Sequence, residues 1–484
     1  MSIERLGIID LGSNSSRLVI YEIYPDNGYQ RVFEMKQNLQ LARDMGSDKL
    51  ISESGLARAI ACLKLFSRAG KLHNVTKWIP VATAAIRQAS NRGRVLREIE
   101  RQTGFQFQVL EEWSEGYYGY LGVVNTIAID DALLFDIGGA STELMLVQNR
   151  NLIEVTSVPF GALTLTEKLS SYEETSRGDK AYEFMTEQLA SIPWLHQAKG
   201  LPLVGLGGTA RAVAKLHRAK AMGRTERIHG YPVGTAYARD AFSTMKNMSA
   251  EKRRKIKGLS KSRGQILVAG LASIAALIER LGSNELIISR SGLREGLFYE
   301  HLLRSEDVQY VASVLDHSIR NLQKLFHVNR PIATMVRDTA LKLFDTLAPV
   351  HKLAPYDRQL LRVTAEIEGV GYYINTEKSN RHSAYVALNS HLYGLSYSQI
   401  QDVANLLEGK GSNAMQKLLL LIRLAKLLTL QLGIDSDELY CVLRDNRLEV
   451  GRARGIQETV HASADSDLDH DFSKGFGIHL AYVE

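Results

Sequence analysis

The stretch IIDLGSNSSRLVI, residues 8–20, decides the fold, because the stretch LFDIGGASTELML, residues 134–146, repeats its pattern. At a constant offset, Asp10 aligns with Asp136 and Gly12 aligns with Gly138. Each copy reads as an apolar strand, an aspartate, a turn rich in small residues, and a second strand. Repetition at so long a period indicates a duplicated domain, since the repeats of solenoid proteins are far shorter.

Each copy predicts a β-hairpin whose turn amides can bind phosphate oxygens, and the preceding aspartate can hold a metal ion directly or through water. Two such hairpins predict two similar α/β lobes that face each other across a cleft. A third turn, Gly207-Gly208-Thr209, follows an expected strand and opens an expected helix, whose N-terminus favours anions. Three turns directed at one cleft favour a phosphate chain as the ligand. Glycines that only permit tight hairpins are the alternative, but that alternative does not require an aspartate in both copies.

Hydrophobic periodicity predicts the remaining elements. We expect helices at 53–69, 92–103, 210–217, 308–326, 332–347, 356–373 and 398–407, and strands at 78–82, 105–110, 201–206, 286–289, 440–445, 447–450 and 479–482. An apolar run from Leu418, interrupted by Arg423 and Lys426, predicts a buried helix. The change from mixed to helical character predicts four domains, at 1–125, 126–303, 304–435 and 436–484.

The composition of the 484 residues, 45% hydrophobic and 23% charged, is that of a globular protein and excludes a collagen, a disordered chain or a rod. No uninterrupted apolar run approaches the ~20 residues that cross a bilayer, so we expect no membrane partner. Two cysteines, Cys62 and Cys441, cannot form a disulfide framework, and the N-terminus has no signal-peptide pattern. We therefore expect a cytoplasmic protein. The net charge of +6 permits a polyanionic ligand, and we expect no nucleic-acid partner.

Charged side chains near the expected cleft suggest the chemistry. Glu111, Glu112 and Glu115 lie together before the second hairpin, and a carboxylate among phosphate-binding amides could accept the proton of an attacking water. A solvated acidic turn or helix cap is the alternative. Arg87 could reach phosphate or, taken alone, be an exposed arginine at a helix start. The run from Lys252 to Lys257, with Lys261 and Arg263, could guide a polyanion or simply be solvated. A P-loop motif is absent, and Gly205–Gly208 lacks the Rossmann spacing.

These motifs together resemble the exopolyphosphatase / guanosine pentaphosphate phosphohydrolase family, in the superfamily of actin, heat-shock proteins and sugar kinases. The matching segments are 10–15, 82–87, 136–143, 207–209 and 292–296, with weaker likeness at 381–385. The resemblance implies actin-like (ribonuclease H-like) lobes around a cleft. It also implies removal of the terminal phosphate from inorganic polyphosphate or guanosine pentaphosphate, usually with Mg, by a protein that forms a homodimer.

The resemblance also assigns roles to single residues. In the family, the catalytic glutamate lies a fixed distance before a Gly-Val pair. Counted back from Gly122-Val123, that position is Glu115, and Glu111 and Glu112 are the alternatives if the alignment shifts. Ala140 replaces the usual third glycine, which suits the turn unless the position needs a positive φ. The predicted phosphate-binding residues are Gly12, Ser13, Asn14, Ser15, Thr83, Arg87, Gly138, Gly139, Ser141, Gly207, Gly208 and Thr209, and the predicted Mg ligands are Asp10, Asp136 and Glu143.

Beyond the lobes, the resemblance implies a mainly helical domain related to metal-dependent HD phosphohydrolases, followed by a small α/β part. An HD site needs an adjacent His-Asp or His-Glu pair, and residues 367–371 read IEGVG at that place. Since His317 and His382 alone make a weak metal site, we expect a non-catalytic domain that shapes the cleft or a dimer interface. Two rival functions remain at this point: a kinase of the same superfamily, and a polyphosphate or nucleotide sensor without turnover.

Overall fold

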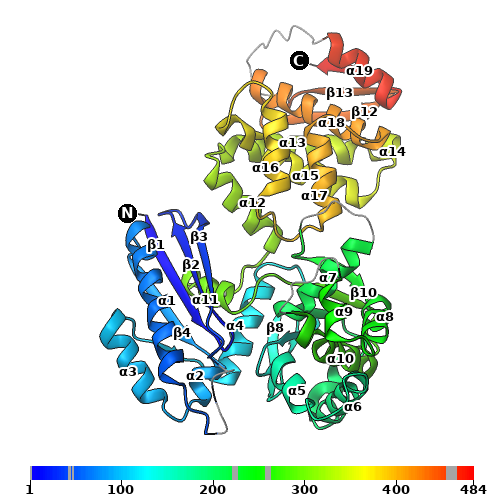
Figure 1. Cartoon of the computed structure of the whole chain (residues 1–484). Coiled ribbons are helices and arrows are strands. Elements are labelled where there is room, and N and C mark those ends of the chain that lie inside the picture. The colour runs from blue at the N-terminus through cyan, green and yellow to red at the C-terminus, as the bar shows by residue number, and fades with distance from the viewer. Residues whose placement is uncertain are drawn as a thin grey trace. The chain divides into compact units, whose positions relative to one another are not determined.

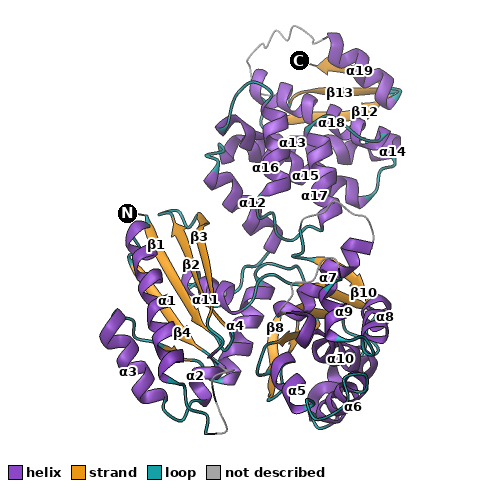
Figure 2. Cartoon of the chain, in the orientation of Figure 1, coloured by secondary structure: helices purple, strands orange, loops and turns teal. Residues whose placement is uncertain are grey.

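The computed structural model describes residues 3–41, 45, 48–220, 227–256, 263–453 and 466–483. The chain divides into two compact units, one up to Val314 and one from Leu315 onward. The first unit mixes sheets with helices, and the second is mainly helical with three strands (Figure 2). The finer division into four domains stays a prediction.

The first sheet contains the first copy of the repeated hairpin. Its strand order is β3-β2-β1-β4-β5, in which β1 is antiparallel to β2 and parallel to β4 (Figure 1). The strands are β1 (Glu4–Leu11), β2 (Ser15–Ile23), β3 (Tyr29–Asn38), β4 (Lys77–Ala82) and β5 (Gln108–Val109). The strand expected at 105–110 is only two residues long, because just Val81 and Ala82 of β4 pair with it.

The second sheet repeats this plan. Its order is β10-β11-β9-β6-β7-β8, so β8-β7-β6-β9-β11 corresponds to β3-β2-β1-β4-β5. Its strands are β6 (Ala132–Ile137), β7 (Thr142–Gln148), β8 (Asn151–Val158), β9 (Leu203–Leu206), β10 (Tyr231–Gly234) and β11 (Glu285–Ile288). In both copies an antiparallel hairpin is followed by two parallel neighbours. The predicted duplication of an actin-like α/β lobe is confirmed.

Helices cover both sheets of the first unit. They are α1 (Glu53–Leu72), α2 (Ala84–Gln88), α3 (Arg92–Thr103), α4 (Glu112–Val124), α5 (Ala162–Lys168), α6 (Arg177–Ala190), the 3₁₀ helix η2 (Pro193–Ala198), α7 (Gly207–Lys220), α8 (Thr235–Met245), α9 (Ala250–Arg254), α10 (Arg263–Leu281) and α11 (Leu293–Leu302). Within α10, the window Gly264–Leu281 is apolar and long enough to cross a membrane, but 78% of it is buried inside the protein. That burial is typical of a core helix.

Helices α4 and α11 pack closely between the two sheets and share one apolar core with strands of both. A Cβ on Gly122 of α4 would lie 2.3 Å from the carbonyl oxygen of Gly292. A Cβ on Gly296 of α11 would lie 2.0 Å from the carbonyl oxygen of Tyr118. Only glycine allows this approach, and the resulting contact fixes the position of α4 and of the glutamates at its start.

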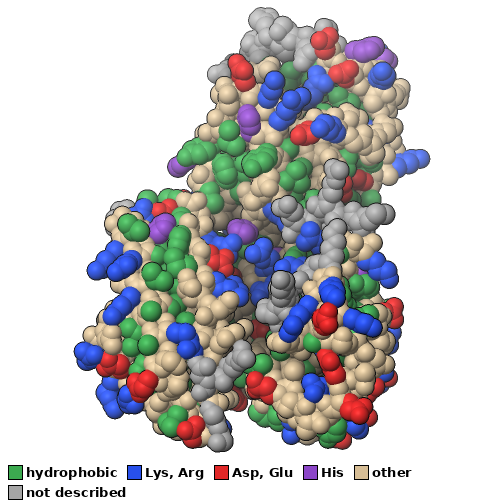
Figure 3. Space-filling model, in the orientation of Figure 1, with side chains coloured by type: hydrophobic (Ala, Val, Ile, Leu, Met, Phe, Trp, Pro, Cys, Tyr) green, Lys and Arg blue, Asp and Glu red, His purple; other side chains and the backbone are tan. Residues whose placement is uncertain are grey.

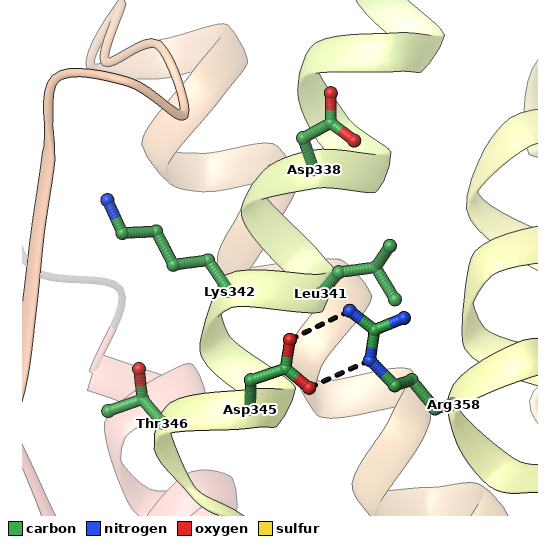
Figure 4. A pocket seen from close by; sticks show the side chains of 6 residues that line it. All are labelled: Asp338, Leu341, Lys342, Asp345, Thr346 and Arg358. Carbon is green, nitrogen blue, oxygen red and sulfur yellow. Dashed lines mark hydrogen bonds and ion pairs between the residues drawn. The ribbon is translucent and has the colours of Figure 1, made fainter. Parts of the chain in front are cut away.

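The second unit is a helical bundle with a small sheet. Its elements are α12 (Val314–Leu325), α13 (Arg330–Thr346), α14 (Ala348–His351), α15 (Pro355–Ile367), the 3₁₀ helix η3 (Glu368–Tyr373), α16 (Ser379–Asn389), α17 (Tyr397–Leu407), α18 (Asn413–Lys426), the π-helical turn η4 (Leu427–Gln431), β12 (Leu439–Arg444), β13 (Arg447–Arg452), α19 (Ser466–Phe476) and β14 (His479–Val483). The sheet order is β12-β13-β14. Arg358 of α15 donates two hydrogen bonds of 2.8 Å to Asp345 of α13, across a broad surface groove (Figure 4).

The second unit confirms the expected helical character, including the buried helix at Leu418, now α18. The single helix expected at 356–373 is instead α15 followed by η3. The chain tightens there because Gly371 packs on α16, where a Cβ would lie 1.9 Å from the carbonyl oxygen of Ser379. Helix α16 itself was not predicted, and α12 begins six residues later than expected.

Candidate active site

The first hairpin turn and its neighbours lie at the carboxyl ends of parallel strands. The amide of Thr83 donates to the carbonyl of Leu11 at 3.2 Å, which places the end of β4 beside the end of β1. The amide of Leu110 donates to the carbonyl of Ala82 at 2.9 Å, which brings in the start of α4. Ligands of open α/β sheets bind at such strand ends.

The two repeated turns have the same local structure. The amide of Gly12 donates to the carbonyl of Ser15 at 3.3 Å, and the amide of Gly138 donates to the carbonyl of Ser141 at 3.0 Å. None of Gly12, Gly138 and Gly139 adopts the left-handed conformation. A Cβ would nevertheless lie 3.0 Å from the carbonyl oxygen of Ser15 at Gly12 and 3.2 Å from that of Ser141 at Gly138, so the tight turns themselves favour glycine at these two positions. A Cβ on Gly139 would meet only open space. At Gly139 the turn therefore gives no reason for glycine, which favours a ligand site there over the alternative of glycines that merely permit a turn.

Ala140 and Gly207 show where a positive φ is needed and where it is not. Ala140 is outside the left-handed region, which confirms that alanine suits the position. Gly207, which follows β9, has a φ of 75°, and a Cβ on it would lie 2.2 Å from Oδ1 of Asp136. The third turn is therefore tied directly to the aspartate of the second hairpin.

Among the three glutamates of the acidic segment, Glu115 is the enclosed one. Its side chain is 14% exposed, whereas that of Glu112 is 49% exposed, and Glu111 is the exposed N-cap of α4. The guanidinium of Arg87, itself 8% exposed, donates from Nη1 to Oε1 of Glu115 and, at 2.7 Å, to the carbonyl of Leu110. Nη2 of the same arginine lies 3.6 Å from Glu112. Of the three candidate glutamates, the geometry thus favours Glu115.

Four carboxylates of the two lobes influence one another electrostatically. Burial raises the pKa of Glu115 to about 7; Arg87 lowers it, and the nearby Asp10 and Asp136 raise it. Burial, together with Glu115 and Asp136, raises the pKa of Glu143 to about 8. The predicted catalytic glutamate and the three predicted metal ligands therefore share one site. A carboxylate with a pKa near neutrality suits a general base.

The two hairpins differ in one charge that sequence reasoning did not use. In β-sheet register Asp136 faces Glu143, whereas Asp10 faces Arg17. Nη1 of Arg294, from the motif at 292–296, also donates to Oδ2 of Asp10 at 2.9 Å. Burial and the nearby Arg294 lower the pKa of Arg17. Arg17 also donates to Glu34 at 3.1 Å, so both guanidinium groups beside the first turn are paired with carboxylates. The repeat itself, with arginine in one copy and glutamate in the other, could have indicated this difference in charge.

The carboxylates offer a partial fit to Mg. Within the ranges described above, no three histidine, cysteine, aspartate or glutamate side chains converge as a metal-binding group. Mg commonly takes one or two carboxylates together with waters and substrate phosphates. Asp136 and Glu143, cross-strand neighbours, fit that pattern. Asp10 instead pairs with Arg294, which supplies positive charge at the place where the sequence suggested a metal.

Several predicted phosphate contacts are not supported by the packing. Thr209 is 1% exposed and its hydroxyl lies against Gly270 of α10. The hydroxyl of Ser141 donates to Glu143 at 2.5 Å, so it positions that carboxyl. The turn residues Ser13, Asn14 and Ser15 are at least partly exposed, as are Gly12, Gly138, Gly139, Gly207 and Gly208, whereas Thr83 is buried beside Gly12.

The basic run is not a continuous free stripe. Arg253 is 5% exposed and donates to the carbonyls of Gly264 and Met248, so it is structural. Lys255 pairs with Glu251 at 2.8 Å. Lys257, Lys261 and the side chain of Arg263 lie outside the described residues. Figure 3 shows other Lys and Arg side chains gathered around a hollow between the two lobes of the first unit.

A duplicated actin-like fold with a largely enclosed glutamate beside glycine turns indicates a class, the two-lobed proteins that act on phosphate groups. Comparison with known proteins makes the assignment specific. The family model described as "Ppx/GppA phosphatase family" matches residues 19–305, and the model of domain III of the same phosphatases matches residues 314–429. The chain belongs to the Ppx/GppA phosphatase family and is a hydrolase of that family.

Individual relatives agree with this assignment. A guanosine-5'-triphosphate,3'-diphosphate pyrophosphatase of Aeromonas hydrophila subsp. hydrophila is 28% identical over 397 residues, covering 81% of this chain and 77% of that protein. The crystal structure of the Aquifex aeolicus family member is 27% identical, with a TM-score of 0.56, and covers 63% of this chain and 100% of its own. A Cytophaga hutchinsonii exopolyphosphatase, 20% identical, has a TM-score of 0.58, covers 64% of this chain and 100% of its own, and shows the shared fold.

Proposed function

We propose that this chain is an exopolyphosphatase, which removes the terminal phosphate of inorganic polyphosphate. One observation carries the proposal that a terminal phosphate is hydrolysed. Glu115, with a pKa raised to about 7, is held by Arg87 and lies close to Asp10 and Asp136, the aspartates of the two hairpins that are predicted to bind phosphate. A linear phosphate chain needs only anion-binding groups and a base at its end, and this site offers both.

In the proposed reaction, amides of the two hairpin turns and of the turn at Gly207 hold oxygens of the terminal phosphoryl group. Glu115 accepts a proton from a water whose oxygen attacks the terminal phosphorus in line with the bridging oxygen. The phosphoanhydride bond breaks, and the shortened chain leaves with the bridging oxygen. The guanidinium groups of Arg17 and Arg294 offset negative charge on the phosphate chain.

We propose Mg as the cofactor, with Asp136 and Glu143 as its protein ligands. When bound, Mg would neutralise charge on the phosphate oxygens. The pair supports this assignment because burial and the nearby Asp136 raise the pKa of Glu143, and a nearby cation would stabilise the ionised carboxylate. The homodimer and the cytoplasmic location stay predictions of the sequence.

Guanosine pentaphosphate is the second candidate substrate. The Aeromonas hydrophila relative, named as a pyrophosphatase of that nucleotide, favours it. Both substrates present a terminal phosphoanhydride, so the same base and turns serve either. The choice depends on what the remainder of the substrate contacts.

The test measures phosphate release from long-chain polyphosphate and from guanosine pentaphosphate in parallel, with Mg and with EDTA. We expect a higher kcat/KM for polyphosphate and loss of release in EDTA. A higher kcat/KM for the nucleotide would make the chain a pentaphosphatase and refute the first proposal. Binding of both compounds without phosphate release would support the sensor, and transfer to a second substrate such as ADP would support the kinase.

A further inference from the structure

A cavity of ≈ 420 Å³ opens in the second unit, far in the sequence from the phosphate site. It lies between the loop that joins α12 to α13, the 3₁₀ helix η3 and the end of α18. Its walls carry four rings, those of Phe326, His327, Tyr372 and Tyr373. Its aliphatic lining includes Val336 and Ala365, both of which belong to the core of the unit. The size and lining are those of small-molecule sites.

The backbone around this cavity departs from regular helix at three places. His327 adopts a φ of 49° at the end of α12. The chain from Glu368 to Tyr373 is a 3₁₀ helix, and the chain from Leu427 to Gln431 is a π-helical turn. Short π-helical segments occur preferentially at functional sites. Three irregular segments that meet at one cavity indicate a built pocket.

Apolar side chains at the rim of the cavity are exposed to an unusual degree. Tyr372 is 52% exposed, Tyr373 59%, Leu430 49% and Ile332 41%. The ring of Tyr373 is nevertheless held in place by its neighbours, 5.7 Å from the ring of Phe326 in a T-shaped contact. Exposed apolar side chains that gather at one place mark binding sites, and an ordered ring offers its face to another planar ring.

An ion pair and a helix end set the electrostatics of the cavity. Nζ of Lys426 lies 2.6 Å from Oε1 of Glu368, and both side chains line the cavity. The start of α13, capped by the side chain of Asn329, also borders it, and the N-terminus of a helix carries partial positive charge. The two side-chain charges cancel, so the helix end leaves a positive surplus. The ammonium group of Lys426 has three N–H donors and Glu368 accepts from one, so the others can donate to an anionic ligand.

We propose that this cavity binds a planar aromatic small molecule carrying one anionic group, with its ring against Tyr372 and Tyr373 and its anion between the start of α13 and Lys426. The site is independent of the proposed phosphohydrolase function, because it uses only residues of the second unit. It includes Glu368 and Gly369, from the segment at which the resemblance would place an HD pair. The pocket thus gives a binding role to a domain that we expect to be non-catalytic.

The test uses two fluorescent probes with the full chain. The first is 8-anilinonaphthalene-1-sulfonate, which has aromatic rings and an anion, and the second is N-phenyl-1-naphthylamine, which has similar rings and no charge. Gly369→Leu fills the pocket, since a Cβ there lies 3.4 Å from Cγ1 of Val328, an ordinary contact. Lys426→Met removes the ammonium group, and Lys417→Met, on the same helix but not in the cavity lining, is the matched control. Thermal unfolding confirms that each variant folds.

We expect Gly369→Leu to abolish one site for both probes. We expect Lys426→Met to weaken the sulfonate at least about tenfold while leaving the neutral probe unchanged, because a hydrogen bond to a charged group contributes about that factor. Lys417→Met should change neither. Equal effects of Lys426→Met on both probes, or no effect of Gly369→Leu, would overturn the proposal.

A displacement experiment identifies the source of the natural ligand. Displacement of the sulfonate by adenosine monophosphate assigns the pocket to nucleotides. Displacement by 1-naphthoate alone assigns it to aromatic carboxylates. Displacement by neither would overturn the proposal, since both carry the ring and the anion that it requires.

Discussion

The contact between Arg87 and Glu115 leads to a quantitative prediction for the variant Arg87→Met. The pKa of Glu115 is about 7 with all its neighbours present. Burial raises this pKa, and the guanidinium of Arg87 lowers it through a hydrogen bond and through its charge. An adjacent opposite charge shifts a carboxyl pKa by roughly 1–3 units, so its removal should bring the pKa to about 8–10. At pH 7 the ionised fraction of Glu115 then falls from about one half to about one tenth or less. We expect kcat/KM at pH 7 to fall at least about fivefold for this reason alone.

The assay is phosphate release from polyphosphate between pH 5.5 and 9.5 with wild-type protein, Arg87→Met and Arg87→Lys. Activity requires ionised Glu115, so kcat/KM rises with pH, with a midpoint near 7 in the wild type. The midpoint should move up in Arg87→Met and less in Arg87→Lys, which keeps a positive charge. Titration of the substrate is common to all three proteins and cancels in their ratios. An unchanged midpoint with a uniform loss at every pH would refute the reasoning and place Arg87 on the substrate instead.

Two further predictions concern the second sheet and its turns. Because the pKa of buried Glu143 is raised to about 8, the folded protein binds its proton more tightly than the unfolded chain, and the free energy of unfolding should fall as pH rises from about 4.5 to 8. Glu143→Gln should remove up to about 4 kcal/mol of that fall, seen as a flatter dependence of urea unfolding on pH; an equally steep dependence would contradict it. Gly207→Ala should reduce phosphate release at least about a hundredfold and destabilise by about 1–3 kcal/mol, because its φ is positive and its Cβ would meet Asp136. Gly139→Ala, with open space for its Cβ, is the control for stability, and an equal loss of stability in both variants would contradict this argument.

The sequence was sufficient to predict the duplicated lobes of the first unit, because the hairpin pattern is a local signal that shows where each strand ends and turns. The aspartates and glycines of residues 8–20 and 134–146 mark strand ends whichever lobe they occupy. Helix α3 was predicted at both of its ends, since its apolar spacing and the following Gly104, with a φ of 76°, are local signals. Helix α16 was missed because its weak amphipathic pattern, with buried Ser383 and exposed Tyr385, gives little periodic signal.

The sequence predicted the carboxylates of the site but not the arginines that pair with them. Glu115 meets Arg87, 28 residues earlier, only because β4 and β5 pair and bring their ends together. Asp10 meets Arg294 across 284 residues. Contacts of this kind follow from sheet order, which a single sequence does not contain. The raised pKa of Glu115 depends on them and on burial, so it too required the structure.

Replacement of single glutamates at the start of α4 tests the central claim most directly. Phosphate release from polyphosphate is measured for Glu115→Gln and for Glu112→Gln, its exposed neighbour on the same helical turn, with substrate binding measured separately. The account predicts a loss of about 10²–10⁴-fold in kcat for Glu115→Gln with binding retained, the range for a general base, and nearly wild-type turnover for Glu112→Gln. Turnover of Glu115→Gln within tenfold of wild type, or a comparable loss in Glu112→Gln, would contradict it.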